Sequence, residues 1–220
     1  MSETKSPLTL GAIFYNNFEL LDVYGPLEMF GNVGPELRVV TVAQKAGAVA
    51  SAQGPKALAE YGFADCPPLD LILLPGGIGT LAEVENPAML EFLRRQSSTA
   101  RVTMSVCSGS GILAKAGLLD GRRATSNKQF FSLITAQNDK VQWVEKARWV
   151  EDGKFVTSSG VSAGMDMSLA VIAKLYGQER AEFLAAAAEY EWHRDANHDP
   201  FIKYLNKGDV AQIVPSAAAQ

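Results

Sequence analysis

The residues best suited to chemistry lie at 102–118 (VTMSVCSGSGILAKAGL), where a short apolar run passes directly into small residues. Residues 102–106 have the apolar, β-branched character of a buried strand, and residues 112–118 have helical spacing. Cys107 therefore falls at a sharp turn from strand to helix, which pushes its side chain into a cleft beside free helix N–H groups. Because these N–H groups and the helix dipole favour an anion, we expect the thiol to ionise and to act as a nucleophile.

The cysteines also allow a purely structural interpretation. A free thiol packs as a small hydrophobe, so Cys107 considered alone fits a buried turn as well as it fits a nucleophile. Cys66 lies in an Asp-Cys-Pro-Pro turn, where we expect a packing role only. Two cysteines make no disulfide framework, and this favours a reducing compartment.

Asp22 is the candidate carboxyl group. Pro26 is tolerated only near the start of a helix, so the sequence predicts a helix over 25–32 that residues 19–23 approach. Asp22 then either caps this helix, as the sequence alone favours, or faces the cleft as an acid whose pKa burial raises. Glu28 lies further along the helix, where we expect it to be solvated.

A second glycine-rich turn follows the buried strand predicted at 69–74. This turn, Pro-Gly-Gly-Ile-Gly at 75–79, lacks the spacing of a dinucleotide fingerprint or a P-loop, so we do not expect nucleotide binding. Parallel strands bring their carboxyl ends to one edge, where the N–H groups of Gly77 and Ser108 are expected to form an oxyanion or anion hole. The alternative is that these glycines only ease tight turns.

Composition limits the remaining classes. The 220 residues, 47 % hydrophobic and 20 % charged, predict one α/β domain over 1–220 with flexible ends at 1–7 and 210–220. The net charge of −4 gives no electrostatic reason to expect nucleic acid or an anionic membrane as a partner. The polar N-terminus lacks a signal peptide, and no apolar run is long enough to cross a bilayer, so we expect a cytoplasmic protein.

Three other segments bear on a site. The sequence predicts helices over 128–138 and 165–176. Asp166 either lies in the first turn of the second helix, where the helix dipole favours a negative charge, or faces the site. His193 and His198, with two nearby aspartates, invite a metal interpretation. Their five-residue spacing does not stack two ligands on one helical face, so we expect no metal.

Six motifs together resemble the DJ-1/PfpI superfamily. They are FELLDVYGPL (18–27), FADCPPLD (63–70), LPGG (74–77), SVCSGS (105–110), AGLLDGRRAT (116–125) and SAGMD (162–166). The likeness covers residues 8–190 and is closest to the isonitrile hydratase branch. It implies a flavodoxin-like (Rossmann-like) α/β sandwich with a mostly parallel central sheet, helices on both faces and a nucleophile elbow.

The resemblance also implies roles for single residues. Cys107 would be the nucleophile, Asp22 the carboxyl beside it, and Ser108 would act on the thiolate through its hydroxyl. The turn at Gly76, Gly77 and Ile78 would line the substrate pocket. Many relatives carry a histidine near residues 125–127, where this chain has Asn127. A Cys–His pair is therefore poorly supported, and Asp22 is the best proton donor.

The reaction implied is hydration of an isonitrile without metal or cofactor. The Cys107 thiolate would attack the terminal carbon, Asp22 would supply a proton, and water would convert the thioimidate into an N-substituted formamide. The alternatives are an enzyme acting on glyoxals and a non-enzymatic cysteine redox or stress sensor.

The partners implied are a small-molecule substrate and a second copy of the chain. The resemblance implies a homodimer with the Asp22 helix near the partner, and no nucleic acid or membrane. The ligand domain of an AraC-type regulator is not expected, since no helix-turn-helix or basic region follows residue 190.

Overall fold

The computed structural model describes residues 6–209. Its elements in chain order are β1 (Leu8–Ile13), α1 (Leu20–Gly31), β2 (Leu37–Val42), β3 (Gly47–Ala50), β4 (Lys56–Ala59), β5 (Leu71–Leu74), α2 (Thr80–Glu83), α3 (Pro87–Thr99), β6 (Val102–Ser105), α4 (Gly109–Lys115), β7 (Arg123–Ala124), α5 (Phe131–Thr135), β8 (Gln142–Trp143), β9 (Trp149–Asp152), β10 (Phe155–Ser158), α6 (Ala163–Tyr176), α7 (Gln178–Ala187) and a 3₁₀ helix at Pro200–Tyr204. Of the expected flexible ends at 1–7 and 210–220, residues 1–5 and 210–220 lie outside the described residues.

A six-stranded sheet in the order β2-β1-β5-β6-β10-β9 forms the centre of the molecule. Its strands run parallel except β9, which pairs antiparallel with β10 at one edge. Every residue of β5 and β6 is buried, as expected for parallel strands covered on both faces. The parallel strands follow the flavodoxin-like order, so the predicted fold class is confirmed.

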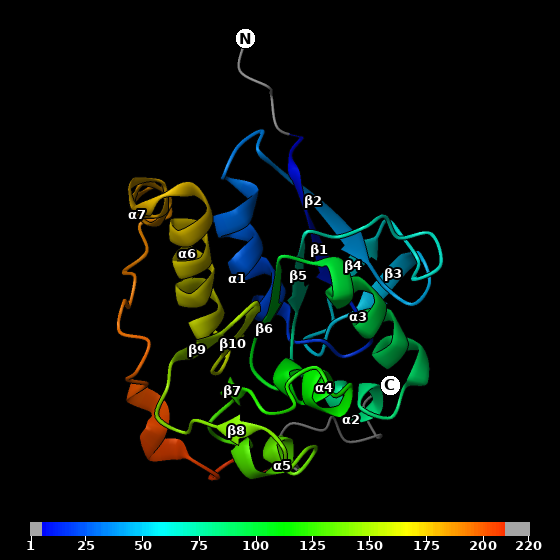
Figure 1. Cartoon of the computed structure of the whole chain (residues 1–220), viewed down its shortest axis with the longest axis vertical. Helices are drawn as coiled ribbons and strands as arrows, with labels where there is room; N and C mark the ends of the chain where they lie inside the picture. The colour runs from blue at the N-terminus through cyan, green and yellow to red at the C-terminus, as the bar shows by residue number, and fades with distance from the viewer. Residues whose placement is uncertain (1–5, 210–220) are drawn as a thin grey trace.

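Helices cover both faces of this sheet. Figure 1 shows α1, α6 and α7 together on one side, and α2, α3 and α4 on the other. α6 packs against α1, α7 and β10, whereas α4 packs against α2, α3 and β6. A separate hairpin of β3 and β4 lies beyond the sheet. No helix in the described part of the chain is long and apolar enough to span a membrane.

The prediction that a helix starts at residue 25 is wrong. α1 begins at Leu20, and Pro26 lies inside it. Pro26 removes one helical hydrogen bond at a cost of about 3 kcal/mol. The same helix face buries Val23, Met29 and Phe30, each of which stabilises the fold by about 1.5–3 kcal/mol. Packing against the sheet and α6 therefore outweighs the local penalty.

The predicted helix over 128–138 is also too long. α5 has only five residues, because the preceding segment makes specific contacts that a helix would break. The Lys128 ammonium turns inward and donates to the Ala147 carbonyl at 2.7 Å and to Thr125 Oγ1 at 2.9 Å. Burial lowers the pKa of Lys128 to about 8, although Asp199 opposes this effect.

Candidate active site

Cys107 lies at the elbow between β6 and α4, in the left-handed backbone region with a φ of 57°. The Val106 N–H donates to the Leu74 carbonyl at 3.0 Å, and the Cys107 N–H donates to the Ser159 carbonyl at 2.9 Å. The elbow is therefore held from β5 on one side and from the end of β10 on the other. Positive φ at a residue with a side chain persists only where the surrounding structure imposes it. The predicted elbow is confirmed.

Two glycines let the turn after β5 meet this elbow. Leu74 and Ser105 are register partners, so both turns leave the sheet at the same edge. A Cβ on Gly76 would lie 2.5 Å from the Ser108 nitrogen, and one on Gly109 would lie 2.5 Å from the Pro75 oxygen. No real Cβ makes such short contacts, so both positions require glycine.

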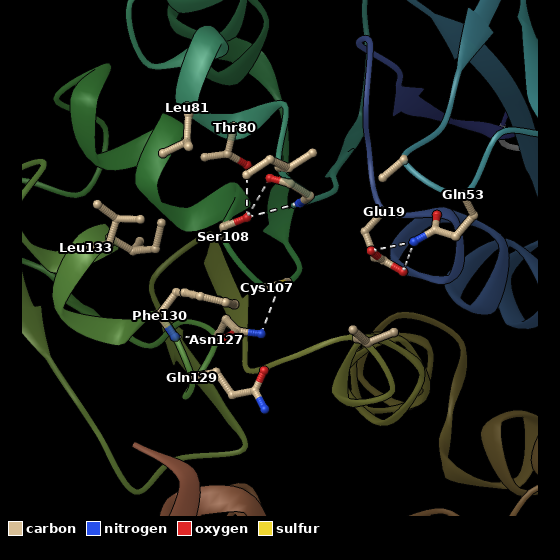
Figure 2. A pocket seen from close by; sticks show the side chains of 15 residues that line it. Glu19, Gln53, Thr80, Leu81, Cys107, Ser108, Asn127, Gln129, Phe130 and Leu133 are labelled. Atoms are coloured by element: carbon tan, nitrogen blue, oxygen red, sulfur yellow. Dashed lines mark hydrogen bonds between the residues drawn. The ribbon is translucent and has the colours of Figure 1, made fainter. Parts of the chain in front are cut away.

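Asn127 contributes the side-chain donor to the thiol. Its Nδ2 donates to Cys107 Sγ at 3.2 Å, as Figure 2 shows. Its Oδ1 accepts the Phe130 N–H at 3.2 Å, and this second bond determines which way the amide faces. Asn127 therefore offers the thiol an amide N–H that does not take up a proton.

The thiol does not ionise readily, contrary to the sequence-based expectation. Cys107 is 7 % exposed, and burial raises the pKa of its thiol far above the usual value. The charge of Asp22 adds to this rise. The N–H groups of Ser108 and Val161 and the Asn127 amide lower the pKa without reversing the shift. Desolvation outweighs these donors, because an apolar environment disfavours the charged form.

Asp22 lies in the first turn of α1 with no exposed surface. Glu19 is the N-cap residue, so the capping interpretation of Asp22 is wrong. Asp22 is buried, as the second interpretation expects, but it is not among the residues that line the cavity. Asp22 Oδ2 accepts the Gly76 N–H at 2.8 Å, while Oδ1 has no hydrogen-bond partner among the described residues. Burial raises the pKa of this carboxyl well above its usual range, the Gly76 N–H opposes the rise, and the Glu19 charge adds to it.

The Ser108 hydroxyl belongs to a buried hydrogen-bond chain that leads away from the thiol. The Gly77 N–H donates to Ser108 Oγ at 3.0 Å, and Ser108 Oγ lies 2.9 Å from Thr80 Oγ1. Thr80 Oγ1 lies 3.1 Å from the Tyr15 hydroxyl, which donates to the Pro75 carbonyl at 2.8 Å. Because the Tyr15 proton goes to Pro75, Thr80 donates to Tyr15, and the Ser108 hydroxyl has both Thr80 Oγ1 and the Gly77 carbonyl, at 3.3 Å, as acceptors.

The hydrogen-bond chain through Ser108 involves one of the two N–H groups of the expected oxyanion hole. The Gly77 N–H is bonded to Ser108 Oγ, and the Ser108 N–H bonds to the thiol of Cys107. Both predicted donors are thus engaged within the protein. The anion hole stays a prediction, and it requires at least one of these bonds to open when substrate binds.

A cavity of about 290 Å³ opens above Cys107. Figure 2 shows it between the Phe130 and Leu133 side and the Glu19 and Gln53 side. Its walls are mainly apolar, with a few amide, hydroxyl and carboxyl groups. The lining residues are Glu19, Ala52, Gln53, Gly77, Ile78, Thr80, Leu81, Cys107, Ser108, Asn127, Gln129, Phe130, Leu133, Ile134 and Val161.

The structure separates the predicted site residues into two groups. Cys107, Ser108, Gly77 and Ile78 line the cavity, whereas Asp22 and Gly76, which are hydrogen-bonded to each other, are not among the lining residues. Sequence reasoning missed several lining or supporting residues, including Glu19, Gln53, Thr80 and Tyr15. Their partners lie 28 to 65 positions away, so no local pattern indicates them.

The other candidates are not among the residues that line the cavity. Asp166 lies in the first turn of α6, as the helix-dipole alternative predicts, and there it pairs with Arg148 at 2.7 Å and accepts the Tyr190 hydroxyl at 3.0 Å. His193 Nε2 lies 3.0 Å from the His198 carbonyl oxygen. In the described part of the chain, no group of three or more metal-binding side chains gathers. Burial raises the pKa of Cys66 to about 11, and its thiol contacts the next carbonyl.

The protein has a mostly parallel flavodoxin-like sheet, a cysteine at a strand-to-helix elbow and a buried carboxyl group nearby. These features define a class of α/β domains that carry a cysteine at the elbow. The chain belongs to the DJ-1/PfpI family. The sequence profile of that family matches residues 11–174, which include both Asp22 and Cys107.

Known proteins with related sequences have different functions. The chain is 33 % identical over 183 residues to the isonitrile hydratase of Pseudomonas putida, covering 83 % of this chain and 78 % of that enzyme. It is 28 % identical over 194 residues to the HTH-type transcriptional regulator GbdR of Pseudomonas aeruginosa, covering 86 % of this chain. The chain spans only 52 % of that regulator's length.

Solved structures agree with the fold. A ThiJ/PfpI family protein from Pseudomonas syringae aligns with a TM-score of 0.77 and 32 % identity, covering 84 % of this chain and 76 % of that one. Drosophila melanogaster DJ-1beta aligns with a TM-score of 0.74 over 84 % of this chain and all of its own length. At 22 % identity, the second likeness shows the fold alone.

Proposed function

We propose that this chain is a cysteine-dependent enzyme that adds water to an isonitrile and releases an N-substituted formamide. The observation that carries the proposal is a buried Asp22 carboxyl close enough to act electrostatically on the Cys107 thiol, which itself lines a mainly apolar cavity. The identity of 33 % between this chain and an isonitrile hydratase supports the choice of substrate class. The cavity suits a small molecule with an apolar substituent.

The raised pKa values of both groups define the starting state of this mechanism. The thiol and the carboxyl are both protonated, so the first step is addition of S–H across the terminal carbon. Cys107 Sγ bonds to that carbon, the Asp22 carboxyl gives it a proton, and the thiol proton returns to the carboxylate. The product is a thioimidate. Asp22 Oδ1, which has no hydrogen-bond partner among the described residues, supports this role.

The second half-reaction uses the same carboxyl. Asp22 protonates the thioimidate nitrogen, and its carboxylate then takes a proton from the water that attacks the carbon. The hydroxyl proton of the resulting adduct moves to sulfur as the C–S bond breaks. This releases the formamide and restores the thiol and the carboxylic acid, so atoms and charges balance over the cycle.

The test is turnover of cyclohexyl isonitrile by purified protein, with formamide measured by NMR. We expect no turnover by Cys107→Ala and a loss of about 100-fold or more in Asp22→Asn, which keeps the Gly76 contact but gives up no proton. Full activity in Cys107→Ala would refute the mechanism. A wild type that leaves the isonitrile intact but consumes methylglyoxal would show glyoxal chemistry instead.

We further infer that the chain works as a homodimer of single domains in the cytoplasm. Leu21 and Tyr24 on α1 are each more than 40 % exposed, and such apolar groups favour a protein partner. Both cysteines are free, which suits a reducing compartment. Light scattering of the wild type and of a Leu21→Glu variant measures the mass. A monomeric wild type would refute the dimer.

A further inference from the structure

The cavity over Cys107 carries one formal charge. Of the 15 residues that line it in the described structure, only Glu19 has a side chain that is charged at neutral pH. The polar remainder consists of amides, hydroxyls and the protonated Cys107 thiol, and no lysine or arginine among the described residues lines it. A charged group that enters therefore meets the Glu19 carboxylate, with no cation among the described lining residues to offset it.

The Glu19 carboxylate is held by a neutral partner. Gln53 Nε2 donates to both of its oxygens at 2.8 Å, and Gln53 Oε1 accepts the Leu20 N–H at 3.1 Å. Figure 2 shows this pair on the side of the cavity opposite Phe130 and Leu133. The amide holds the carboxylate in place but leaves its charge uncompensated, whereas an arginine would neutralise it.

The nearest basic residue in sequence to the lining does not compensate this charge. Lys128 follows Asn127, but its ammonium points into the buried cluster, where it donates to the Ala147 carbonyl and lies 3.8 Å from Asp199. The wall opposite Glu19 is mainly apolar around Leu81, Phe130 and Leu133, so it offers an anion few hydrogen bonds in exchange for its hydration shell.

We propose that Glu19 makes this site selective by charge, so that it accepts uncharged or cationic small molecules and excludes anionic ones. The proposal rests on the proposed function only for the identity of the reacting group. The preferred isonitrile has an apolar body that lies against the wall around Leu81 and Phe130, and a neutral or ammonium-bearing end near Glu19.

Labelling of Cys107 tests charge selection without any turnover. The probes are three methanethiosulfonates, with a trimethylammonioethyl, a sulfonatoethyl or a methyl group. The thiolate attacks the sulfenyl sulfur, a mixed disulfide forms, and methanesulfinate leaves. The protein carries Cys66→Ser, so that Cys107 is the only thiol present. We expect the cationic reagent to react faster than the anionic one, relative to their rates with free cysteine.

The decisive quantity is the ratio of the cationic rate to the anionic rate. Glu19→Gln removes the charge and keeps a group that bonds to Gln53, so we expect the ratio to fall about threefold to tenfold. Both reagents react with the same thiol, so a change in its pKa cancels in the ratio. Glu28→Gln is the control, because Glu28 is exposed on the same helix and does not line the cavity. An unchanged ratio in Glu19→Gln would overturn the proposal.

Aryl isonitriles with a para trimethylammonium or a para carboxylate group extend the test to catalysis. We expect kcat/KM to favour the ammonium compound in the wild type and to lose that preference in Glu19→Gln. A labelling ratio that responds to Glu19→Gln, with no isonitrile hydrated, would refute the proposed function and leave charge selection standing. If the isonitrile is hydrated but the labelling ratio stays the same in Glu19→Gln, charge selection alone is refuted.

Discussion

The Asn127 amide donates a hydrogen bond to the Cys107 thiol, with Nδ2 3.2 Å from Sγ. The orientation of this amide is determined by the Phe130 N–H, so the donor is in place before any substrate arrives. An amide stabilises a thiolate but does not accept its proton. Asn127 therefore lowers the pKa of Cys107, whereas the proton transfers of the proposed reaction fall to Asp22.

Asn127→Leu should make Cys107 harder to ionise. The substitution removes the donor at similar volume, so the pKa of the thiol rises further. We expect alkylation by iodoacetamide at pH 8 to slow by about tenfold or more in a Cys66→Ser background. Gln129→Leu is the matched control, because Gln129 lines the same cavity without bonding to the thiol. Equal slowing in both variants would contradict a specific role for Asn127.

Asp22→Asn should stabilise the protein at neutral pH even as it impairs the proposed reaction. Burial raises the pKa of Asp22 in the folded state, so the folded protein keeps a proton that the unfolded chain loses above about pH 4. The stability of the wild type therefore falls as pH rises from that value towards the folded-state pKa. The amide that the substitution introduces has no such proton to lose.

Urea unfolding at pH 4, 6 and 8 measures this difference. We expect the variant to gain free energy of unfolding over the wild type at pH 6 and 8, and to gain little at pH 4. Glu28→Gln should show no such trend, since Glu28 is exposed. A pH-independent difference between Asp22→Asn and the wild type would contradict a raised pKa.

Thr80→Val should weaken the elbow from a distance. The change removes the hydroxyl that links Ser108 to Tyr15 and leaves each of these buried hydroxyls one partner short. We expect a loss of about 1–3 kcal/mol in the free energy of unfolding, together with slower isonitrile turnover. Thr99→Val is the control, because Thr99 is exposed at the end of α3. Equal stability in Thr80→Val and the wild type would show that the hydrogen-bond chain through Thr80 contributes nothing to the free energy of unfolding.

Arg148→Met should destabilise the fold strongly. Arg148 pairs with Asp166 at 2.7 Å and lies 3.6 Å from Asp199, and the substitution leaves both buried carboxylates without this cation. We expect a loss of about 3–5 kcal/mol in the free energy of unfolding. Lys174→Met breaks an exposed pair with Glu151 and should lose at most about 1 kcal/mol. Similar losses in both variants would contradict this reasoning.

The sequence by itself determined the features that depend on short-range patterns. The apolar run at 102–106, the small residues after it and the turn at 75–79 predict two buried parallel strands with glycine-rich turns at one edge. Steric limits and side-chain spacing act over a few residues, so they can be recognised without the fold. The place of Cys107 at the elbow follows from them, whereas the flavodoxin-like order of the sheet was implied by the resemblance to the DJ-1/PfpI superfamily.

Only the tertiary structure decided the chemical state of the site. Asp22 is an acid rather than a helix cap because α1 begins at Leu20, and its pKa rises because the fold removes it from water. Burial likewise raises the pKa of the Cys107 thiol, whereas the local sequence predicts a lowered one. Desolvation and hydrogen bonds depend on which distant segments meet, as Asn127 meets Cys107 across 20 positions and Gln53 meets Glu19 across 34. Local sequence patterns do not encode these distances.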